Sequence, residues 1–308
     1  MAQAPYLFPA GSRLGADNLI LQARATRHRV EGFAGPLSIK TVISGEVAWI
    51  IQGRQLVVDP SSFLILSAGE TYSMNIAAER PVETCCVFFA PGFVEELARD
   101  LTSPLEKALD SPAGTAPALS YLSAFHADRD RATVRHVQSL AKRCAQALTP
   151  SGFEEEFVDL GVDLLHLYER IRQQAARLPA VRSSTRQELF RRLLMGREYL
   201  HSHASGAVSL ATVARAAGLS LFHFHRGFTH AFQQTPHFYL TQLRLARARR
   251  LIEGGSSVLQ ACLEVGFSSP SAFSRLFRSH YGEPASQVRR KLARLSKNSG
   301  SVAGILRP

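Results

Sequence analysis

The chain has 308 residues, a length that accommodates two or three domains, each with its own hydrophobic core. Its 36 Lys and Arg residues outnumber its 25 Asp and Glu residues, which gives a formal net charge of +11. No run approaches the roughly 18 uncharged apolar residues of a membrane span, and the start lacks the features of a secretory signal. None of the four cysteines forms a C-x-x-C pair, which argues against a structural zinc site. We therefore expect a soluble, cytoplasmic protein with no membrane partner, metal or cofactor.

Residues 1–92 are predicted to form a small β domain. Short apolar runs such as Val47–Ile51 and Phe63–Leu66 are separated by glycine-containing turn signals at residues 44–46 and 52–54. In one run, residues 37, 39 and 41 alternate with polar or small neighbours, Lys40 among them. Several short strands at this spacing are typical of a sandwich or barrel.

The pattern changes after Pro91, where apolar residues begin to recur at helical spacing. Residues 93–177 are predicted to be helical, either as a layer on the core or as a surface for self-association. The segment 178–187 loses this periodicity and gains Pro and Ser, so it is predicted to be a linker. It is followed by a helical domain at residues 188–294 and a flexible tail at residues 295–308.

The helical domain contains the same helix-turn-helix pattern twice, at Leu210–Pro236 and at Val258–Pro284. Each copy has a small residue where two helices cross, a glycine at the turn, a phenylalanine anchor and then Arg-x-Phe. In the first copy these positions are Ala214, Gly218, Phe224, Arg226 and Phe228, and in the second they are Cys262, Gly266, Phe273, Arg275 and Phe277. We expect the four phenylalanines to lie in the core. A repeat of this kind indicates a DNA-reading domain.

The excess positive charge of the chain lies on this domain. Between Arg186 and Arg294 there are 16 Lys and Arg residues and 5 Asp and Glu residues, a net charge of +11. Residues 1–185 hold 18 basic and 20 acidic side chains. Cationic charge confined to one compact domain is typical of a protein that binds a polyanion.

The stretch from Leu193 to Arg290 resembles the DNA-binding domain of the AraC/XylS transcription regulators. The residues that carry the resemblance are Ser209-Leu210, Val213-Ala214, Gly218-Leu219-Ser220, Arg226, Phe228, Tyr239-Leu240, Arg244-Leu245, Val265-Gly266-Phe267-Ser268, Ser271, Phe273-Ser274-Arg275, Phe277-Arg278 and Gly282-Glu283-Pro284. Two positions of the first module depart from the family pattern: Gln233 stands where a glycine usually follows the recognition helix, and Gly227 lies inside that helix. In the second module, Ala261-Cys262 stands where the family favours Ile-Ala.

The resemblance implies that two recognition helices enter adjacent major-groove segments of double-stranded DNA. The family's base-contacting positions fall on Phe222, His225, Arg226, Pro270, Ser271, Ser274 and Arg275. Arginine can donate two hydrogen bonds to a guanine, which contributes roughly 1–3 kcal/mol of discrimination. The alternative, that Arg226 and Arg275 only form bridges within the domain, stays open here.

The first half of the chain resembles, more distantly, the cupin-like sensor domain of effector-responsive family members. That resemblance implies a bound small molecule and a homodimer, with Trp49, Tyr72 and Phe88 as candidate pocket residues. The alternative is that these three side chains are ordinary core. A catalytic cupin would need several histidines for its metal, whereas His28 is the only histidine before His126. We therefore expect no catalytic residues and no enzyme activity.

The fold class expected is α+β: a cupin-like β domain with a helical extension, followed by an all-α domain of two helix-turn-helix units. The function expected is sequence-specific transcription regulation, as an activator that contacts RNA polymerase and responds to a small-molecule effector. Two alternatives remain. One is a non-specific architectural DNA-binding protein, whose affinity would fall with salt but change little with sequence. The other is a cupin enzyme fused to a DNA-binding module.

Overall fold

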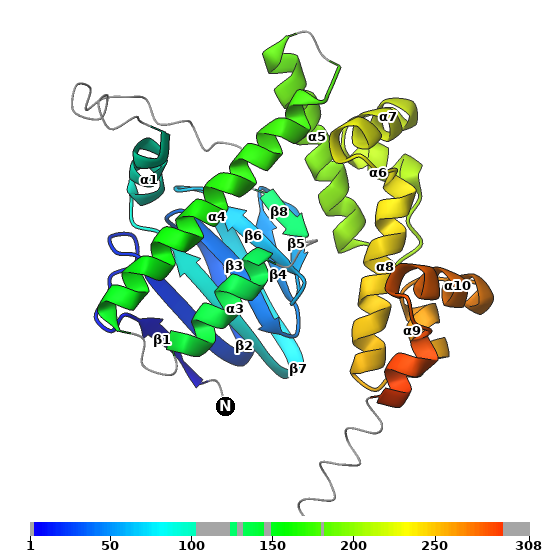
Figure 1. The fold of residues 1–308 in the computed structure, drawn as a ribbon, viewed down its shortest axis with the longest axis horizontal. Coiled ribbons are helices and arrows are strands. Elements are labelled where there is room, and N and C mark those ends of the chain that lie inside the picture. The colour runs from blue at the N-terminus through cyan, green and yellow to red at the C-terminus, as the bar shows by residue number, and fades with distance from the viewer. Residues whose placement is uncertain (1–2, 103–123, 128–131, 145–148, 180–181, 292–308) are drawn as a thin grey trace, which may run out of the picture. The chain divides into compact units, whose positions relative to one another are not determined.

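A computed structural model of the protein describes residues 3–102, 124–127, 132–144, 149–179 and 182–291. It divides into two compact units, Met1–Ala176 and Arg177–Pro308, and each is described by itself (Figure 1). The first is an antiparallel β unit with helices, and the second is entirely helical among its described residues. The predicted α+β class, with a β domain before a helical domain, is confirmed. The predicted tail at residues 295–308 lies outside the described residues.

The strands of the first unit join into one antiparallel sheet. The strands are β1 (Gln3–Phe8), β2 (Leu19–Ala34), β3 (Ser38–Ser44), β4 (Val47–Ile51), β5 (Arg54–Val58), β6 (Ser62–Leu66), β7 (Thr71–Phe88) and β8 (Ala124–Ala127). Their order is β1-β2-β7-β3-β6-β8, and the β4–β5 hairpin joins through β4. The 18-residue β7 pairs with β4 near its start and with β3 near its end. One strand therefore ties together both parts of the sheet.

One face of the sheet, the inner face, is buried by the strands themselves. The hydrophobic core cluster on this face takes residues from β3, β4, β5, β6 and β7. The members of this inner cluster are Val42, Val47, Trp49, Ile51, Leu56, Val58, Leu64, Leu66, Tyr72, Ile76 and Val82. Side chains of alternating strand residues point to opposite faces. Ile39 and Val87, which are paired across β3 and β7, therefore belong to the other, outer face.

Helices α1 (Phe93–Thr102), α3 (Ala132–Cys144) and α4 (Pro150–Ala176) complete the first unit. Gln22 on β2 donates a hydrogen bond from its Nε2 to the carbonyl oxygen of Ala141 on α3, at 2.8 Å. Phe89, just after β7, meets Phe157 of α4 edge to face at 5.6 Å between ring centroids. In Figure 1, α3 and α4 lie across the sheet. These helices cover the outer face, so both faces of the sheet are buried.

The helix boundaries differ from the sequence pattern near residue 180. Helix α4 ends at Ala176, and the next helix, α5 (Ser183–Ser202), begins inside the predicted linker 178–187. Residues 183–185 are Ser-Ser-Thr, a composition that we interpreted as a loop. These residues form the first turn of α5, whose N-cap is Arg182 without a capping hydrogen bond from its side chain.

The second unit contains the helices α5 to α10. After α5 come α6 (Leu210–Ala216), α7 (Leu221–Phe232), α8 (Pro236–Glu253), α9 (Val258–Glu264) and α10 (Pro270–Tyr281), and residues 285–291 are also helical. Each of α6–α10 begins at a Ser or Thr whose side chain accepts a hydrogen bond from a backbone N–H of the first turn. The capping residues are Ser209, Ser220, Thr235, Ser257 and Ser269. Such caps contribute about 1 kcal/mol each and fix where a short helix starts. No described helix in either unit is long and apolar enough to span a membrane.

Phenylalanines form the centre of each helix-turn-helix module. Phe224, Phe228, Phe273 and Phe277 are all fully buried, as the sequence predicted. In the second module, Phe273 and Phe277 pack in one cluster with Ala261, Cys262 and Leu245. The small side chains of α9 thus let α10 approach closely.

In the first module the close approach depends on a glycine of α5. A Cβ atom added to Gly196 would lie 2.3 Å from Cε2 of Phe224, a distance at which something must move. Because Phe224 is fully buried, its ring has little room to give way.

We therefore expect Gly196→Ala to lower the free energy of unfolding of the second unit by about 1–2 kcal/mol, because the overpacking cost exceeds the gain of about 1 kcal/mol in helix propensity. Denaturation of the full-length protein, followed by circular dichroism, measures the change. Gly206→Ala is the control, since a Cβ there would meet only the carbonyl oxygen of His203 at 3.6 Å. A Gly196→Ala variant as stable as the wild type would contradict this account.

Candidate DNA-binding site

The turns of the two modules use glycine in the left-handed conformation. Gly218 has a φ of +65° and Gly266 a φ of +84°, as the sequence pattern predicted. The small residue that precedes each turn, Ala214 or Cys262, is 1% exposed. The two copies of the motif therefore share both the turn and the close helix crossing.

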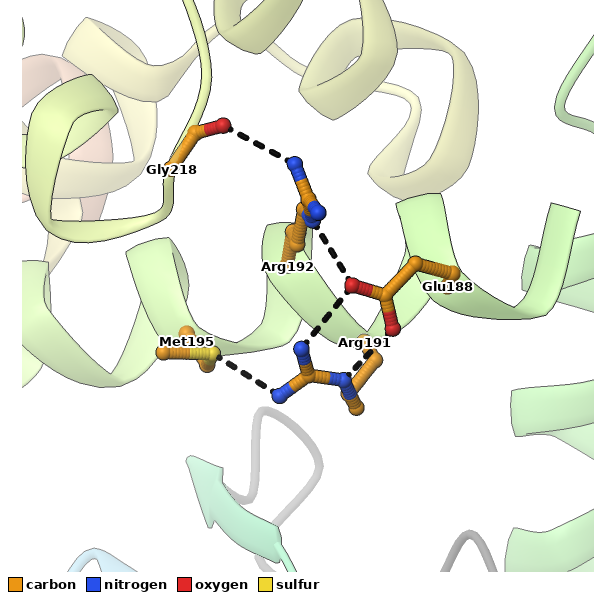
Figure 2. A network of polar contacts seen from close by, with 5 residues as sticks. All are labelled: Glu188, Arg191, Arg192, Met195 and Gly218. Atoms are coloured by element: carbon orange, nitrogen blue, oxygen red, sulfur yellow. Dashed lines mark hydrogen bonds and ion pairs between the residues drawn. The ribbon is translucent and has the colours of Figure 1, made fainter. Parts of the chain in front are cut away.

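The first turn is held by α5, the helix before it. Arg192 of α5 donates a hydrogen bond from Nη1 to the carbonyl oxygen of Gly218 at 3.1 Å. Glu188, one turn earlier, accepts hydrogen bonds from both Arg191 and Arg192 at 2.8 Å (Figure 2). These hydrogen bonds lower the pKa of Glu188 to about 2. Its carboxylate therefore stays ionised and orients the guanidinium that reaches the turn.

The second turn lies against an arginine of α8 that is bonded to the segment before α6. Arg244 donates from Nε to the carbonyl oxygen of Ala204 at 2.8 Å and from Nη2 to that of Gly206 at 2.7 Å. A Cβ atom on Gly266 would lie only 3.0 Å from Nη2 of the same arginine. Each turn glycine therefore lies against an arginine of the preceding long helix. Our sequence analysis assigned neither arginine this role, although Arg244 is part of the family resemblance.

The predicted base-contacting side chains lie on the exposed faces of α7 and α10. The exposed residues are Phe222, His225, Arg226, Pro270, Ser271, Ser274 and Arg275. Phe222 is 66% exposed, which is unusual for so large an apolar side chain. The structure thus gathers three of the predicted residues on α7 and four on α10. Exposure is what a groove-reading side chain needs.

Arg226 and Arg275 differ from Arg192, Arg244 and Arg249 in their contacts. Within the described residues, neither side chain forms a recorded hydrogen bond or ion pair. By contrast, Arg249 on α8 binds Glu253 at 2.8 Å and lies 3.9 Å from Glu283. The alternative that Arg226 and Arg275 serve as internal bridges therefore finds no partner among the described side chains.

Gly227 and Gln233, which depart from the family pattern in the first module, are each explained by their local structure. Gly227 is buried, and a Cβ there would lie 3.2 Å from Cδ1 of Leu193 on α5, so glycine permits close helix packing. Gln233 ends α7 with a φ of 54°, the conformation that glycine adopts most easily. Its Nε2 donates a hydrogen bond to the carbonyl oxygen of His230 at 2.8 Å, which offsets part of the conformational cost.

Helix α8 connects the two modules (Figure 1). Its 18 residues give a length of about 27 Å at 1.5 Å per residue. One turn of B-DNA is roughly 34 Å, so a rigid connector of this size is on the scale that separates adjacent major-groove segments on one face of a duplex. Two exposed recognition faces at the ends of such a connector can read two neighbouring groove segments.

The candidate pocket residues of the β unit all lie in its interior. Trp49 and Tyr72 belong to the inner cluster, and Phe88 packs beside it with Leu19 and Cys86. Their exposed fractions are 1%, 8% and 3%, respectively. Within the described part of the chain, no three His, Cys, Asp or Glu side chains gather as they would around a metal ion.

Residues 213–291 match the family model described as "Helix-turn-helix domain". The chain is 23% identical over 220 residues to the uncharacterized HTH-type transcriptional regulator YbfI of Bacillus subtilis, covering 71% of this chain and 72% of YbfI. It is 35% identical over 92 residues to the HTH-type transcriptional activator RhaS of Escherichia fergusonii. That match covers 30% of this chain and only 33% of RhaS.

Among solved structures, a transcriptional regulator with an AraC-type DNA-binding domain from Chromobacterium violaceum is similar at 28% identity. The similarity covers 33% of this chain and 93% of that chain, with a TM-score of 0.32. The relatives in both comparisons are regulators that carry a helix-turn-helix. Residues 213–291 therefore contain a helix-turn-helix domain, as the family model describes.

The arginine at the second turn provides a test of how the site is built. Arg244→Ala leaves two backbone carbonyls without their donor, so we expect the free energy of unfolding to fall by about 1–2 kcal/mol. Arg244→Lys should not restore it, because an ammonium lacks the fork that reaches both oxygens. Denaturation of the full-length variants measures the change. Arg215→Ala, which removes the same charge from the exposed side of α6, should stay within about 0.5 kcal/mol of the wild type. Equal losses in Arg244→Ala and Arg215→Ala would contradict this role.

Proposed function

We propose that this chain is a DNA-binding transcription regulator with an AraC-type helix-turn-helix domain, and that it reads a specific operator through α7 and α10 together. The observation that carries the proposal is the pair of unengaged arginines, Arg226 and Arg275, at corresponding places on two exposed helices. The net charge of +11 between Arg186 and Arg294 supports binding to the phosphate backbone. The base-reading side chains would then add sequence preference to that non-specific affinity.

The two recognition helices differ in what they offer a base. On α7, Phe222 can press on a thymine methyl, His225 can donate to a purine or a phosphate, and Arg226 can donate to a guanine. On α10, Arg275 is accompanied by Pro270, Ser271 and Ser274, which are small. We therefore assign most of the base discrimination to α7 and more of the backbone anchoring to α10.

Activation of transcription through contact with RNA polymerase is part of the proposal. It is supported by RhaS, which is named a transcriptional activator and is 35% identical to the C-terminal part of this chain. The protein would act in the cytoplasm, where it meets the promoter. Its relatives are named transcriptional regulators, and we assign the chain no catalytic role.

We further assign effector sensing to residues 1–92, with a small molecule bound in the β unit, and dimerisation to the helices between residues 93 and 177. We place the effector at the inner face of the sheet, because the candidate pocket residues Trp49, Tyr72 and Phe88 lie there. A dimer would present two DNA-binding units and would recognise two operator half-sites.

Selection of bound sequences from random DNA by the full-length protein, at near-physiological salt, tests the function. We expect an enriched motif that spans two adjacent major-groove segments, and a second copy at fixed spacing if the protein dimerises. Tight binding without any enriched sequence, together with a steep loss of affinity in salt, would support an architectural DNA-binding protein instead.

Single substitutions then assign the contacts. Arg226→Ala should weaken binding to the selected operator by about 1–3 kcal/mol and relax the sequence preference at one position. Arg275→Ala should weaken binding with a smaller change in preference. Arg13→Ala removes the same charge from the β unit and should leave both affinity and preference unchanged. An equal loss for Arg226→Ala on operator and random DNA, measured by fluorescence anisotropy, would make Arg226 a phosphate contact.

A further inference from the structure

A pocket of about 370 Å³ lies where the connection between β2 and β3 meets the connection between β7 and α1. This volume is within the roughly 300–1,000 Å³ of small-molecule sites. Leu37 of the first connection and Phe89 of the second both line it, and the backbone N–H of Phe89 donates to the carbonyl oxygen of Leu37 at 2.9 Å. None of the inner-cluster residues is among its described lining residues. We call it the α1 pocket, and it lies beside the inner cluster and not within it.

The loop between β1 and β2 forms another wall of the α1 pocket. Leu14 of this loop lines the pocket and is 42% exposed. Asn18, at the end of the loop, accepts through Oδ1 a hydrogen bond from the backbone N–H of Ala90, another lining residue, at 2.8 Å. Asp17 accepts one from the backbone N–H of Arg13 at 2.7 Å, which closes the loop on itself. The pocket is therefore preformed, and a ligand does not need to order this wall when it binds.

Two phenylalanine rings belong to the lining of the α1 pocket. Phe33 meets Tyr72 edge to face at 5.6 Å between ring centroids, and Phe89 stacks on Phe93 of α1 at 6.2 Å. These contacts hold both rings in place. Because the face of an aromatic ring is electronegative, such rings attract an organic cation and do not attract an anion.

Glu95 is the only residue with an ionisable side chain among the described lining residues of the α1 pocket. It lies in the first turn of α1 and is partly buried. Within the described part of the chain, its carboxylate forms no recorded hydrogen bond or ion pair. The neighbouring Glu96 differs, since its carboxylate lies 4.0 Å from the guanidinium of Arg99. A partly buried carboxylate without a partner gains most from a cation that also fills the apolar space beside it.

An acidic residue in the first turn also stabilises a helix through the helix dipole. Glu95 and Glu96 both occupy the first turn of α1, so both can serve the helix in this way. Only Glu95 lines the pocket. The pair therefore separates a role in the helix from a role in the pocket, and Glu96 provides a matched control.

We infer that the α1 pocket binds an apolar molecule that carries one ammonium group. The ammonium donates to the carboxylate of Glu95, and the apolar part of the ligand packs against Leu14, Phe33 and Phe89. This site goes beyond the proposed function, which places an effector at the inner face of the sheet and assigns no ligand to α1. It does not depend on how α7 and α10 read an operator.

Calorimetric titration of the full-length protein in phosphate buffer at pH 7 tests the site. The probes are 2-phenylethylamine and hexylamine, which are protonated at this pH, each against the uncharged alcohol of the same shape, 2-phenylethanol or hexan-1-ol. We expect each ammonium to bind at least about ten-fold more tightly than its alcohol, because the charge-assisted hydrogen bond to Glu95 is lost in the alcohol. The chain has a net charge of +11, so non-specific attraction would favour an anion and cannot produce this preference.

Glu95→Gln should abolish the preference for the ammonium, because it keeps the size of the side chain and removes its charge. Glu96→Gln removes the same charge from the same turn of α1 and should keep the preference. Leu14→Ala, at a half-exposed loop position that tolerates truncation, should weaken the ammonium and the alcohol by the same factor. Thermal melting without ligand shows whether each variant is folded.

Several results would overturn the inference. These are no calorimetric response to either ammonium at millimolar concentration, equal affinity of the ammonium and the alcohol for the wild type, or an undiminished preference in Glu95→Gln. An equal loss of preference in Glu95→Gln and Glu96→Gln would show only a general attraction to the acidic start of α1. Unchanged binding of both probes in Leu14→Ala would place them outside the α1 pocket.

Discussion

The DNA-binding unit depends on how two very short helices are held in place. Helices α6 and α9 have seven residues each, too few to be stable alone in water. Each is fixed at its start by a serine cap and at its end by a turn glycine that lies against an arginine from a longer helix. Arg192 bonds the carbonyl of the first turn, and Arg244 bonds the chain that leads into α6 while lying against the second turn. The geometry of both recognition helices follows from these contacts.

This arrangement divides the arginines of a strongly basic unit into two groups. Arg192, Arg244 and Arg249 are engaged with backbone carbonyls or carboxylates and stabilise the fold. Arg226 and Arg275 have no recorded protein partner within the described residues and project from the recognition helices. The net charge of the unit therefore attracts DNA as a whole, whereas a contact that distinguishes one base from another needs an arginine that projects from a recognition helix, as Arg226 and Arg275 do.

The local features of the second unit could be predicted from sequence, because caps, turn glycines and helical periodicity are determined by neighbouring residues. The burial of Phe224 and Phe273 followed from the same pattern. The close contact between Gly196 and Phe224 could not be predicted, since it joins residues that are distant in sequence. In the β unit, strand alternation indicated which residues of β3 share a face. It could not show that both faces of β3 are buried, the inner one by other strands and the outer one by helices, so the burial of Lys40 was not expected.

The two units thus treat charge in opposite ways, and the difference bears on function. The DNA-binding unit exposes its reading groups and uses the remaining arginines to fix the backbone. The β unit buries the ammonium group of Lys40 beside the rings of Phe88 and Tyr72, a placement that costs stability because no hydrogen-bond acceptor among the described residues meets it.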